Sequence, residues 1–152
     1  MKTRELLKRC AAIVCAAALA LSVPIAHAHH AFAAEFDANT PLLLRGKISR
    51  IEWINPHAWV HIVVEEPGKP PKTWAVEGGT PNTLLRAGLS KDTLKIGTEI
   101  VVRGFQSKDH HCEPTCKANG RDVTFPDGRK VFMGSSGTGA PRDGSDPNEP
   151  PK

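Results

Sequence analysis

The sequence predicts an all-β fold with one short helix, and three patterns indicate it. Residues 57–64 alternate between two faces, as a half-buried strand does. Turn signals rich in proline and glycine, at 67–71 and 126–129, separate short apolar runs. One punctuated helix stands between the third and fourth predicted strands. This order, with a long bulged first strand, predicts a small OB-fold-like five-stranded barrel, and a two-sheet sandwich without closure is the alternative.

The first predicted strand runs from Leu42 to Ile54 and contains a break in its alternation. Leu44 and Ile48 share one face, whereas Ile51 has the opposite parity. One extra residue near Ser49-Arg50, a β-bulge, would restore the phase and bend the strand.

The second predicted strand follows the break at Asn55-Pro56 and presents two different faces. One face is apolar and is expected in the core: Ala58, Val60, Ile62 and Val64. The other face carries His57, Trp59, His61 and Val63. At about 3.3 Å of rise per residue the two imidazoles stand about 13 Å apart, with an indole between them. Together with Trp53, the residues His57, Trp59 and His61 are the predicted ligand-binding face.

The remaining elements are shorter. Further strands are predicted at 72–77, 99–105, 121–125 and 130–133, with a polar loop at 106–120. The helix should start with Thr80 as N-cap and Pro81 at its first position, and should end at Gly88. We expect Leu84, Leu85 and Ala87 on its buried side.

Residues 1–28 have the pattern of a cleaved export signal. A positive end precedes the apolar run 11–23, and Ala26-His27-Ala28 is a typical cleavage site. The run is too short for a spanning helix, which needs about 20 apolar residues. We therefore expect a soluble periplasmic protein with no transmembrane segment after processing. Its parts would be an N-terminal arm (29–41), the barrel domain (42–133) and a disordered tail (134–152).

The arm contains two aromatic residues at helical spacing. Phe32 and Phe36 are four residues apart, so a single helical turn would dock both rings on the domain. An extended arm is the alternative.

Charge argues against a nucleic-acid partner. The signal holds four of the 20 Lys and Arg and one of the 16 Asp and Glu, which leaves the mature chain with a net charge of +1. The mature chain therefore lacks the excess of basic residues that is typical of nucleic-acid-binding proteins. The chain also lacks the common nucleophile, zinc-protease and phosphate-loop motifs, so no catalytic residue is predicted. We expect Glu35, Asp37, Glu52 and Glu77 to be solvated surface carboxylates.

Outside the signal, all histidines fall in three pairs, which is a pattern suited to copper or zinc. His29 and His30 follow the cleavage site, so His29 would carry a free α-amine beside its imidazole and form a chelate. This start resembles the copper histidine brace of copper-dependent polysaccharide oxygenases. His57 and His61 are too far apart for joint ligation, so each would need partners from another segment. The predicted metal ligands are His29, His30, His57 and His61.

The third pair, His110 and His111, precedes Cys112 and Cys116. These four residues are a less favoured metal set of imidazoles and thiolates. In an oxidising compartment a Cys112–Cys116 disulfide is the simpler expectation.

The chain resembles a bacterial family of small exported proteins known only as a domain of unknown function. Four stretches carry the resemblance: H-H-A-F-A-A-E-F-D (29–37), E-W-I-N-P-H-A-W (52–59), G-T-P-N-T-L-L-R-A-G (79–88) and P-D-G-R-K-V-F (126–132). The resemblance implies one exported β-domain and brings no reaction and no ligand.

Three hypotheses about function remain open at this point. The first is a non-catalytic periplasmic binding module for copper or zinc, or for another small ligand. The second is an interaction or scaffold protein for a periplasmic or membrane partner, in which the histidines are incidental. The third is a copper-dependent oxidase or oxygenase.

Overall fold

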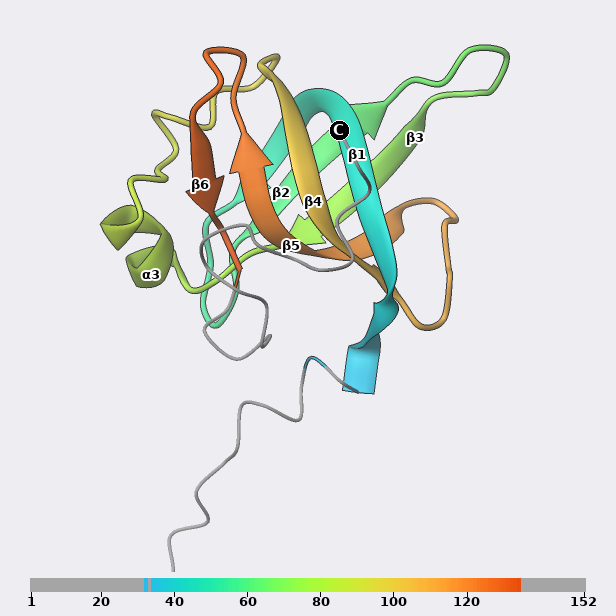
Figure 1. Cartoon of the computed structure of the whole chain (residues 1–152), viewed down its shortest axis with the longest axis horizontal. Helices are drawn as coiled ribbons and strands as arrows, with labels where there is room; N and C mark the ends of the chain where they lie inside the picture. The colour runs from blue at the N-terminus through green and yellow to red at the C-terminus, as the bar shows by residue number, and fades with distance from the viewer. Residues whose placement is uncertain (1–31, 33, 135–152) are drawn as a thin grey trace, which may run out of the picture.

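The computed structural model describes residues 32 and 34–134 of the 152-residue chain. The predicted signal, His29, His30 and residues 135–152 lie outside the described residues. The described chain forms a sheet that curls around one core, with α3 packed at one end (Figure 1). Its elements are β1 (Phe36–Glu52), β2 (Trp59–Val64), β3 (Lys72–Glu77), α3 (Pro81–Arg86), β4 (Glu99–Ser107), β5 (Cys116–Thr124) and β6 (Lys130–Phe132).

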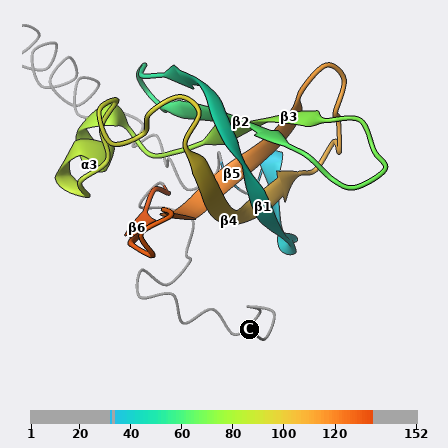
Figure 2. The same cartoon turned by 90° about the horizontal axis from the view of Figure 1, so that it is seen from above.

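The sheet closes into a five-stranded ring. The hydrogen-bonded order is β3-β2-β1-β4-β5-β6, and β3 also pairs with β5, so β1, β2, β3, β5 and β4 form a closed circuit (Figure 2). The closing pair is parallel and runs from Trp74↔Cys116 to Glu77↔Asn119, whereas the other pairs are antiparallel. The prediction of a small five-stranded barrel is confirmed, and the alternative of a two-sheet sandwich without closure is wrong because β3 pairs with β5. The barrel is not regular, because β6 adds a sixth strand that pairs with β5.

β1 begins six residues before the predicted start at Leu42. Phe36 already pairs with Ser107 of β4, and Pro41 pairs with Phe105. The partner strand lies more than 60 residues away in the sequence, so no local pattern marks this start. Pro41 is tolerated because a proline, which lacks an N–H, can occupy a strand position at an edge or irregularity, and the register shifts between Phe36 and Pro41.

The predicted bulge in β1 is confirmed. The register between β1 and β2 shifts between Ile48 and Arg50, so Ser49 is the extra residue. Its hydroxyl donates to the carbonyl oxygen of His61 at 3.2 Å. The shift buries Ile48 and turns Arg50 to the opposite side of the sheet.

The core occupies the inside of the ring. The β2 face predicted to be apolar supplies Ala58, Val60 and Ile62, which are fully buried, while Val64 is partly buried against them. The other strands add a matching inner set: Leu44, Ile48, Trp74, Val76, Ile100, Val102, Ala118 and Val123.

α3 is the predicted helix. Thr80 is its N-cap, and the Thr80 hydroxyl accepts a hydrogen bond from the Thr83 amide at 3.2 Å. Gly88 follows its C-cap with a φ of +85°, a conformation that favours glycine. Leu84 is buried as predicted, but Leu85 is 52% exposed, and Ala87 at the C-cap is exposed as well. The expectation for Leu85 is wrong because so short a helix buries one side, and successive residues point in different directions.

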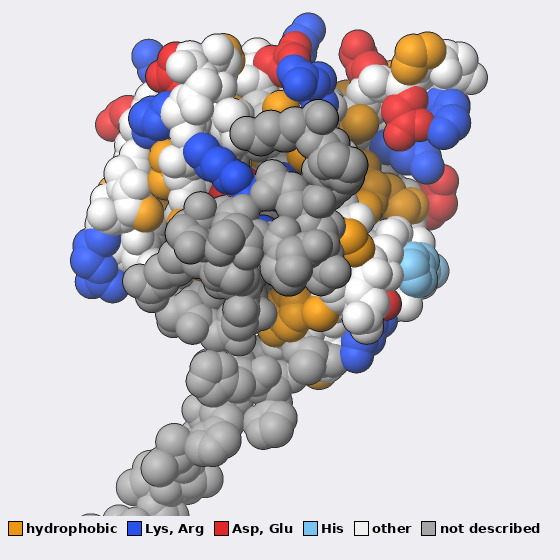
Figure 3. All heavy atoms as spheres, viewed as in Figure 1, with side chains coloured by type: hydrophobic (Ala, Val, Ile, Leu, Met, Phe, Trp, Pro, Cys, Tyr) orange, Lys and Arg blue, Asp and Glu red, His pale blue; other side chains and the backbone are white. Residues whose placement is uncertain are grey.

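The described surface is mixed in charge. Figure 3 shows acidic and basic side chains interspersed around the face it presents, in keeping with the near-neutral charge predicted for the mature chain. No helix in the described part of the chain has both the length and the apolar character needed to span a bilayer.

Candidate functional site

A row of side chains crosses the outer surface of the ring from β1 to β5. Glu52 pairs with Trp59, Trp59 with Glu77, and Glu77 with Asn119. Residues paired across neighbouring strands share a face of the sheet. Because the adjacent Val60 points into the core, this row points outward.

A second outer row lies one step along the same strands. Arg50 pairs with His61, His61 with Ala75, and Ala75 with Lys117. The ammonium of Lys117 lies 5.4 Å from the ring centroid of Trp59, so a cation–π contact joins the two rows.

The N-terminal arm docks on this surface. Residues 32, 34 and 35 are helical, and the Phe32 ring lies 5.7 Å from that of Phe36 and 5.6 Å from that of Phe105. Phe105 is the strand partner of Asn119, so the arm begins beside the outer row. The helical turn ends before Phe36, which is the first residue of β1, so the helical alternative holds for Phe32 and the extended one from Phe36 onward.

Glu35 fastens the arm at the same place. Its carboxylate pairs with Lys117, and its backbone carbonyl accepts a hydrogen bond from the Lys108 amide at 2.9 Å. The arm thereby meets the barrel next to Trp59. We call the following residues the outer-face cluster: Glu35, His57, Trp59, Glu77, Lys117 and Asn119.

His57 is held in one orientation by the end of β3. Its Nδ1 atom lies 3.2 Å from the carbonyl oxygen of Gly78. A carbonyl can only accept, so Nδ1 carries the hydrogen and the neutral ring has its lone pair on Nε2. Nε2 is an atom through which histidine commonly binds metals, and the side chain is 32% exposed. Among the described site residues, His57 thus has a fixed ring orientation and a partly exposed side chain.

Glu77 is a buried carboxylate of the cluster whose burial the sequence did not indicate. It is 8% exposed, with Oε1 3.6 Å from His57 Nδ1, and the Asn119 amide donates to Oε1 at 3.4 Å. Burial raises the pKa of the Glu77 carboxyl, the charges of His57 and Lys117 and the Asn119 hydrogen bond oppose the rise, and the charge of Glu35 adds to it. The expectation of a solvated surface carboxylate is wrong for Glu77, because the arm and β5 lie over the end of β3.

The other carboxylates in the predicted surface set have local partners. Glu52 pairs with Arg50 at 2.6 Å, and Glu35 pairs with Lys117. Asp37 accepts from the Asn39 amide and the Thr40 hydroxyl, and these hydrogen bonds lower its pKa.

His61 and Trp53 are both held by contacts within the fold. His61 is 8% exposed, and its Nε2 lies 2.8 Å from Glu52 Oε1 and 3.0 Å from Arg50. Both partners are within hydrogen-bond distance of Nε2, so this atom is already engaged within the sheet in either tautomer. Trp53 is partly buried against the core.

The third histidine pair lies in the exposed loop between β4 and β5. Cys112 and Cys116 form the predicted disulfide, which leaves no thiolate for a metal. Within residues 32 and 34–134, no three His, Cys, Asp or Glu side chains are close enough to hold a metal ion together. A metal at His57 would therefore need ligands from outside the described residues, where His29 and His30 lie.

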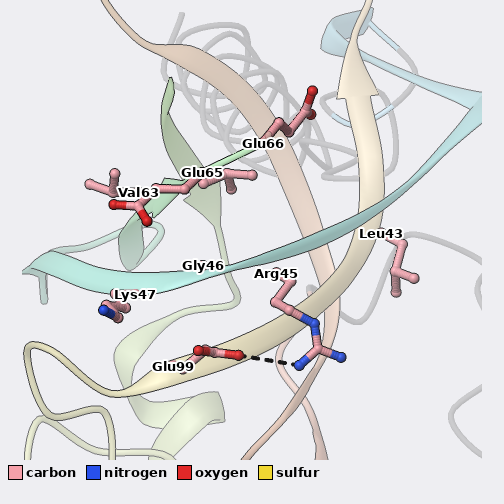
Figure 4. A pocket seen from close by; sticks show the side chains of 9 residues that line it. Leu43, Arg45, Gly46, Lys47, Val63, Glu65, Glu66 and Glu99 are labelled. Carbon is pink, nitrogen blue, oxygen red and sulfur yellow. Dashed lines mark hydrogen bonds and ion pairs between the residues drawn. The ribbon is translucent and has the colours of Figure 1, made fainter. Parts of the chain in front are cut away.

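A shallow groove of about 350 Å³ lies elsewhere on the ring, where β1 passes the end of β2. Figure 4 shows Arg45 and Glu99 pointing toward each other on one side of β1, with Glu65 and Glu66 across the groove. Its lining carries both charges and the exposed Leu43, and it does not include a residue of the outer-face cluster.

The fold and the cluster define a small β-barrel module with a polar site on its outer face, next to a docked N-terminal arm. The chain belongs to the family of unknown function DUF6152, which matches residues 16–115. The matched range contains three of the four stretches that carry the resemblance, and it ends before Lys117 and Asn119. No curated protein and no solved structure gives a significant match to the chain.

Proposed function

We propose that this protein is a non-catalytic periplasmic module that binds a divalent transition metal, copper first and zinc second. His57 would supply one ligand through Nε2, and the N-terminal segment would supply the others through His29 and His30. The observation that carries the proposal is the fixed orientation of His57, whose Nδ1 donates to the Gly78 carbonyl. Ligating histidines typically donate their other ring N–H to a carbonyl or carboxylate in this way.

The docked arm supports the participation of His29 and His30. They precede Glu35 by six and five positions, and a chain spans at most about 3.5 Å per residue. Six residues reach at most about 21 Å, so the chain is short enough to bring either histidine to Glu35, which contacts Lys117 of the outer-face cluster. Cleavage after Ala28 would add the α-amine of His29 as a further nitrogen donor.

The disulfide supports a periplasmic location. Cysteine pairs persist as disulfides in oxidising compartments and are rare in the reducing cytosol. The Cys112–Cys116 bond and the signal pattern of residues 1–28 point to the same compartment.

His61 is left out of the proposed ligand set. Its Nε2 is bonded to Glu52, and freeing it would break the ion-pair network that joins β1 to β2.

Calorimetric titration of the exported protein with Cu(II) and Zn(II) tests the proposal. The wild type should bind one equivalent, and His29→Ala/His30→Ala should weaken Cu(II) binding at least tenfold. His110→Ala/His111→Ala is the matched control, since it removes an exposed histidine pair away from the cluster and should leave the affinity unchanged. Equal affinities in the wild type and in a His29→Ala/His30→Ala/His57→Ala variant would contradict the proposal.

A further inference from the structure

We propose that β1 docks an extended peptide segment of another protein along one of its edges. The segment would pair with β1 as an added antiparallel strand, with apolar side chains toward the barrel and basic side chains toward solvent. The inference uses no residue of the outer-face cluster and goes beyond the proposed function. Metal binding and peptide binding are measured separately, so either can fail without the other.

The two neighbours of β1 cover different lengths of it. β4 pairs with β1 from Pro41 to Lys47 with no register shift in that range. β2 reaches β1 only from Lys47 onward, where Lys47 pairs with Val63, and β2 ends at Val64. From Pro41 to Arg45, one edge of β1 therefore has no strand beside it in the described part of the chain. We call this stretch the free edge.

The backbone groups of Leu43 and Arg45 point to the free edge. In an antiparallel pair, hydrogen-bonded positions alternate with positions whose N–H and C=O point to the other side. The Ile48 amide donates to the Thr98 carbonyl at 3.0 Å, and the Ile48 carbonyl accepts from the Gly97 amide at 2.7 Å. Ile48 thus bonds on the β4 side. Leu43 and Arg45 lie an odd number of positions away, so each offers an N–H and a C=O on the side opposite β4.

A groove of about 350 Å³ runs along the free edge (Figure 4). Leu43 and Arg45 line it from β1, and Glu65 and Glu66 line it from the segment after β2. Leu43 is 62% exposed, and Val64 in the same lining is only partly buried against the core. An added strand would cover Val64 with an apolar side chain and bond to β1 through its backbone. Such addition of a strand to an exposed sheet edge is an established mode of peptide recognition.

Charge favours a basic segment. The groove is lined by more carboxylates than cations: Glu65, Glu66 and Glu99 against Arg45 and Lys47. Arg45 is already paired with Glu99 at 3.2 Å. Glu65 has no ion-pair partner among residues 34–134. A lysine or arginine on the outward side of the added strand would supply that partner.

Two other occupants suit the free edge less well. A second copy pairing through its own free edge would share only residues 41–45 of each chain, whereas a stable interface buries at least about 1,000 Å². Pro41 lacks an N–H and ends this stretch, which is a common protection against pairing between copies. Residues 135–152 contain prolines at 141, 147, 150 and 151, so they have a poor sequence for an added strand.

Titration with a capped Val-Lys-Val-Lys-Val-Lys peptide tests the inference. The ¹⁵N-labelled wild-type chain should bind one equivalent, with the largest shifts at the amides of Leu43, Arg45 and Glu65. A peptide with glutamate in place of each lysine should bind at least about tenfold more weakly, because like charges face each other across the groove. Equal affinities for the two peptides, or no shift at Leu43 and Arg45, would overturn the inference.

N-methylation of the peptide tests backbone pairing without changing the protein. In an antiparallel pair, the peptide residues opposite Leu43 and Arg45 direct their N–H toward β1 and share the outward face with them. These residues are the lysines. Methylating the lysine nitrogens should weaken binding at least about tenfold, whereas methylating the valine nitrogens should change it less than about threefold. A loss in the valine-methylated peptide, or no loss in either, would overturn the inference.

Leu43→Pro is the matching change in the protein, because it removes an N–H that β4 does not use. It should weaken peptide binding at least about tenfold, and Leu43→Ala, which keeps the N–H, should change it less than about threefold. Slow hydrogen exchange at Leu44 checks that the β1–β4 pair persists in Leu43→Pro. If that pair is lost, the methylated peptides decide. Equal affinities in folded Leu43→Pro and in the wild type would overturn the inference.

The chain without peptide gives a further readout. Hydrogen exchange should be fast at Leu43 and Arg45 and slow at Leu44 and Gly46, whose amides face β4. Slow exchange at Leu43 would show that the free edge is already covered. A dimer of the wild type that Leu43→Pro dissociates would identify a second copy as the occupant. Either result would overturn the inference.

Discussion

The Nδ1 atom of His57 lies 3.6 Å from Oε1 of Glu77, although the two residues come from different strand ends and neither lies in the core. Gly78 accepts the Nδ1 hydrogen at 3.2 Å, so a single turn at the end of β3 supplies both the carbonyl and the carboxylate. An arrangement that buries a charge beside an imidazole should lower stability when no ligand is present. That cost can be measured.

Glu77→Gln should stabilise the metal-free protein at neutral pH. Burial raises the pKa of the Glu77 carboxyl, so the native state holds this proton more tightly than the unfolded chain does. The contribution to the free energy of unfolding is present below the ordinary pKa of the carboxyl and is lost as pH rises through its raised native value. The melting temperature of Glu77→Gln should therefore exceed that of the wild type at about pH 7, and the gap should shrink at about pH 4.

Thermal unfolding with a chelator present measures this difference. Glu52→Gln should lower the melting temperature or leave it unchanged, because it removes an ion-pair partner of Arg50 and His61. A lower melting temperature for Glu77→Gln at neutral pH would count against this reading.

Phe32→Ala should release the arm while leaving the barrel folded. Phe32 contacts the rings of Phe36 and Phe105, and aromatic pairs contribute about 0.5–1.5 kcal/mol each beyond their buried area. Hydrogen exchange should speed up at the Lys108 amide, which donates to Glu35, and stay slow at Ile62 in β2. Leu43→Ala, at an exposed position on β1, is the control. Unchanged exchange at Lys108 in Phe32→Ala would show that the ring does not hold the arm.

Several parts of the fold could be read from local sequence. The change of parity before Ile51 predicted a bulge near Ser49-Arg50, where the register shift is found. One extra residue in a strand reverses the face that every later residue occupies, so the sequence pattern shows it. Thr80, Pro81 and Gly88 located α3, because capping is a property of single residues. The same alternation identified the outward face of β2 that carries His57.

The rest depended on contacts between distant segments. β5 begins at Cys116, five residues before the predicted start, because it pairs there with Trp74 of β3. That pairing also places Asn119 beside Glu77. A lone glutamate at a strand end has no local feature to mark it as buried, so Glu77, Lys117 and Glu35 could not be grouped from the sequence. The pattern of paired histidines gave no reason to separate His57 from His61, which differ in their surroundings.

Gly104→Ala should destabilise the ring strongly. A Cβ at Gly104 would lie 2.1 Å from the backbone oxygen of Asn119, which cannot move without opening the β4–β5 pair. We expect a loss of about 3 kcal/mol or a failure to fold. Gly78→Ala is a graded comparison, since its Cβ would meet a backbone oxygen at 3.2 Å. Denaturant unfolding of both variants provides the measurement, and equal losses would contradict the close approach at Gly104.

Cys112→Ala/Cys116→Ala should lower the free energy of unfolding by about 2 kcal/mol, the chain-entropy value for so short a loop. Hydrogen exchange at the start of β5 should also become faster, because Cys116 is the first residue of β5 that pairs with β3. Denaturant unfolding and a thiol assay of the wild type check this. Free thiols at both Cys112 and Cys116 in the wild type purified without reductant would refute the disulfide.

The central claim is that His57 binds a divalent metal through Nε2, and His57→Ala tests it most directly. The measurement is the Cu(II) dissociation constant of the purified chain beginning at His29, determined by competition with a chelator of known affinity. The account predicts at least a tenfold weaker affinity in folded His57→Ala than in the wild type. The same dissociation constant in both proteins would contradict it.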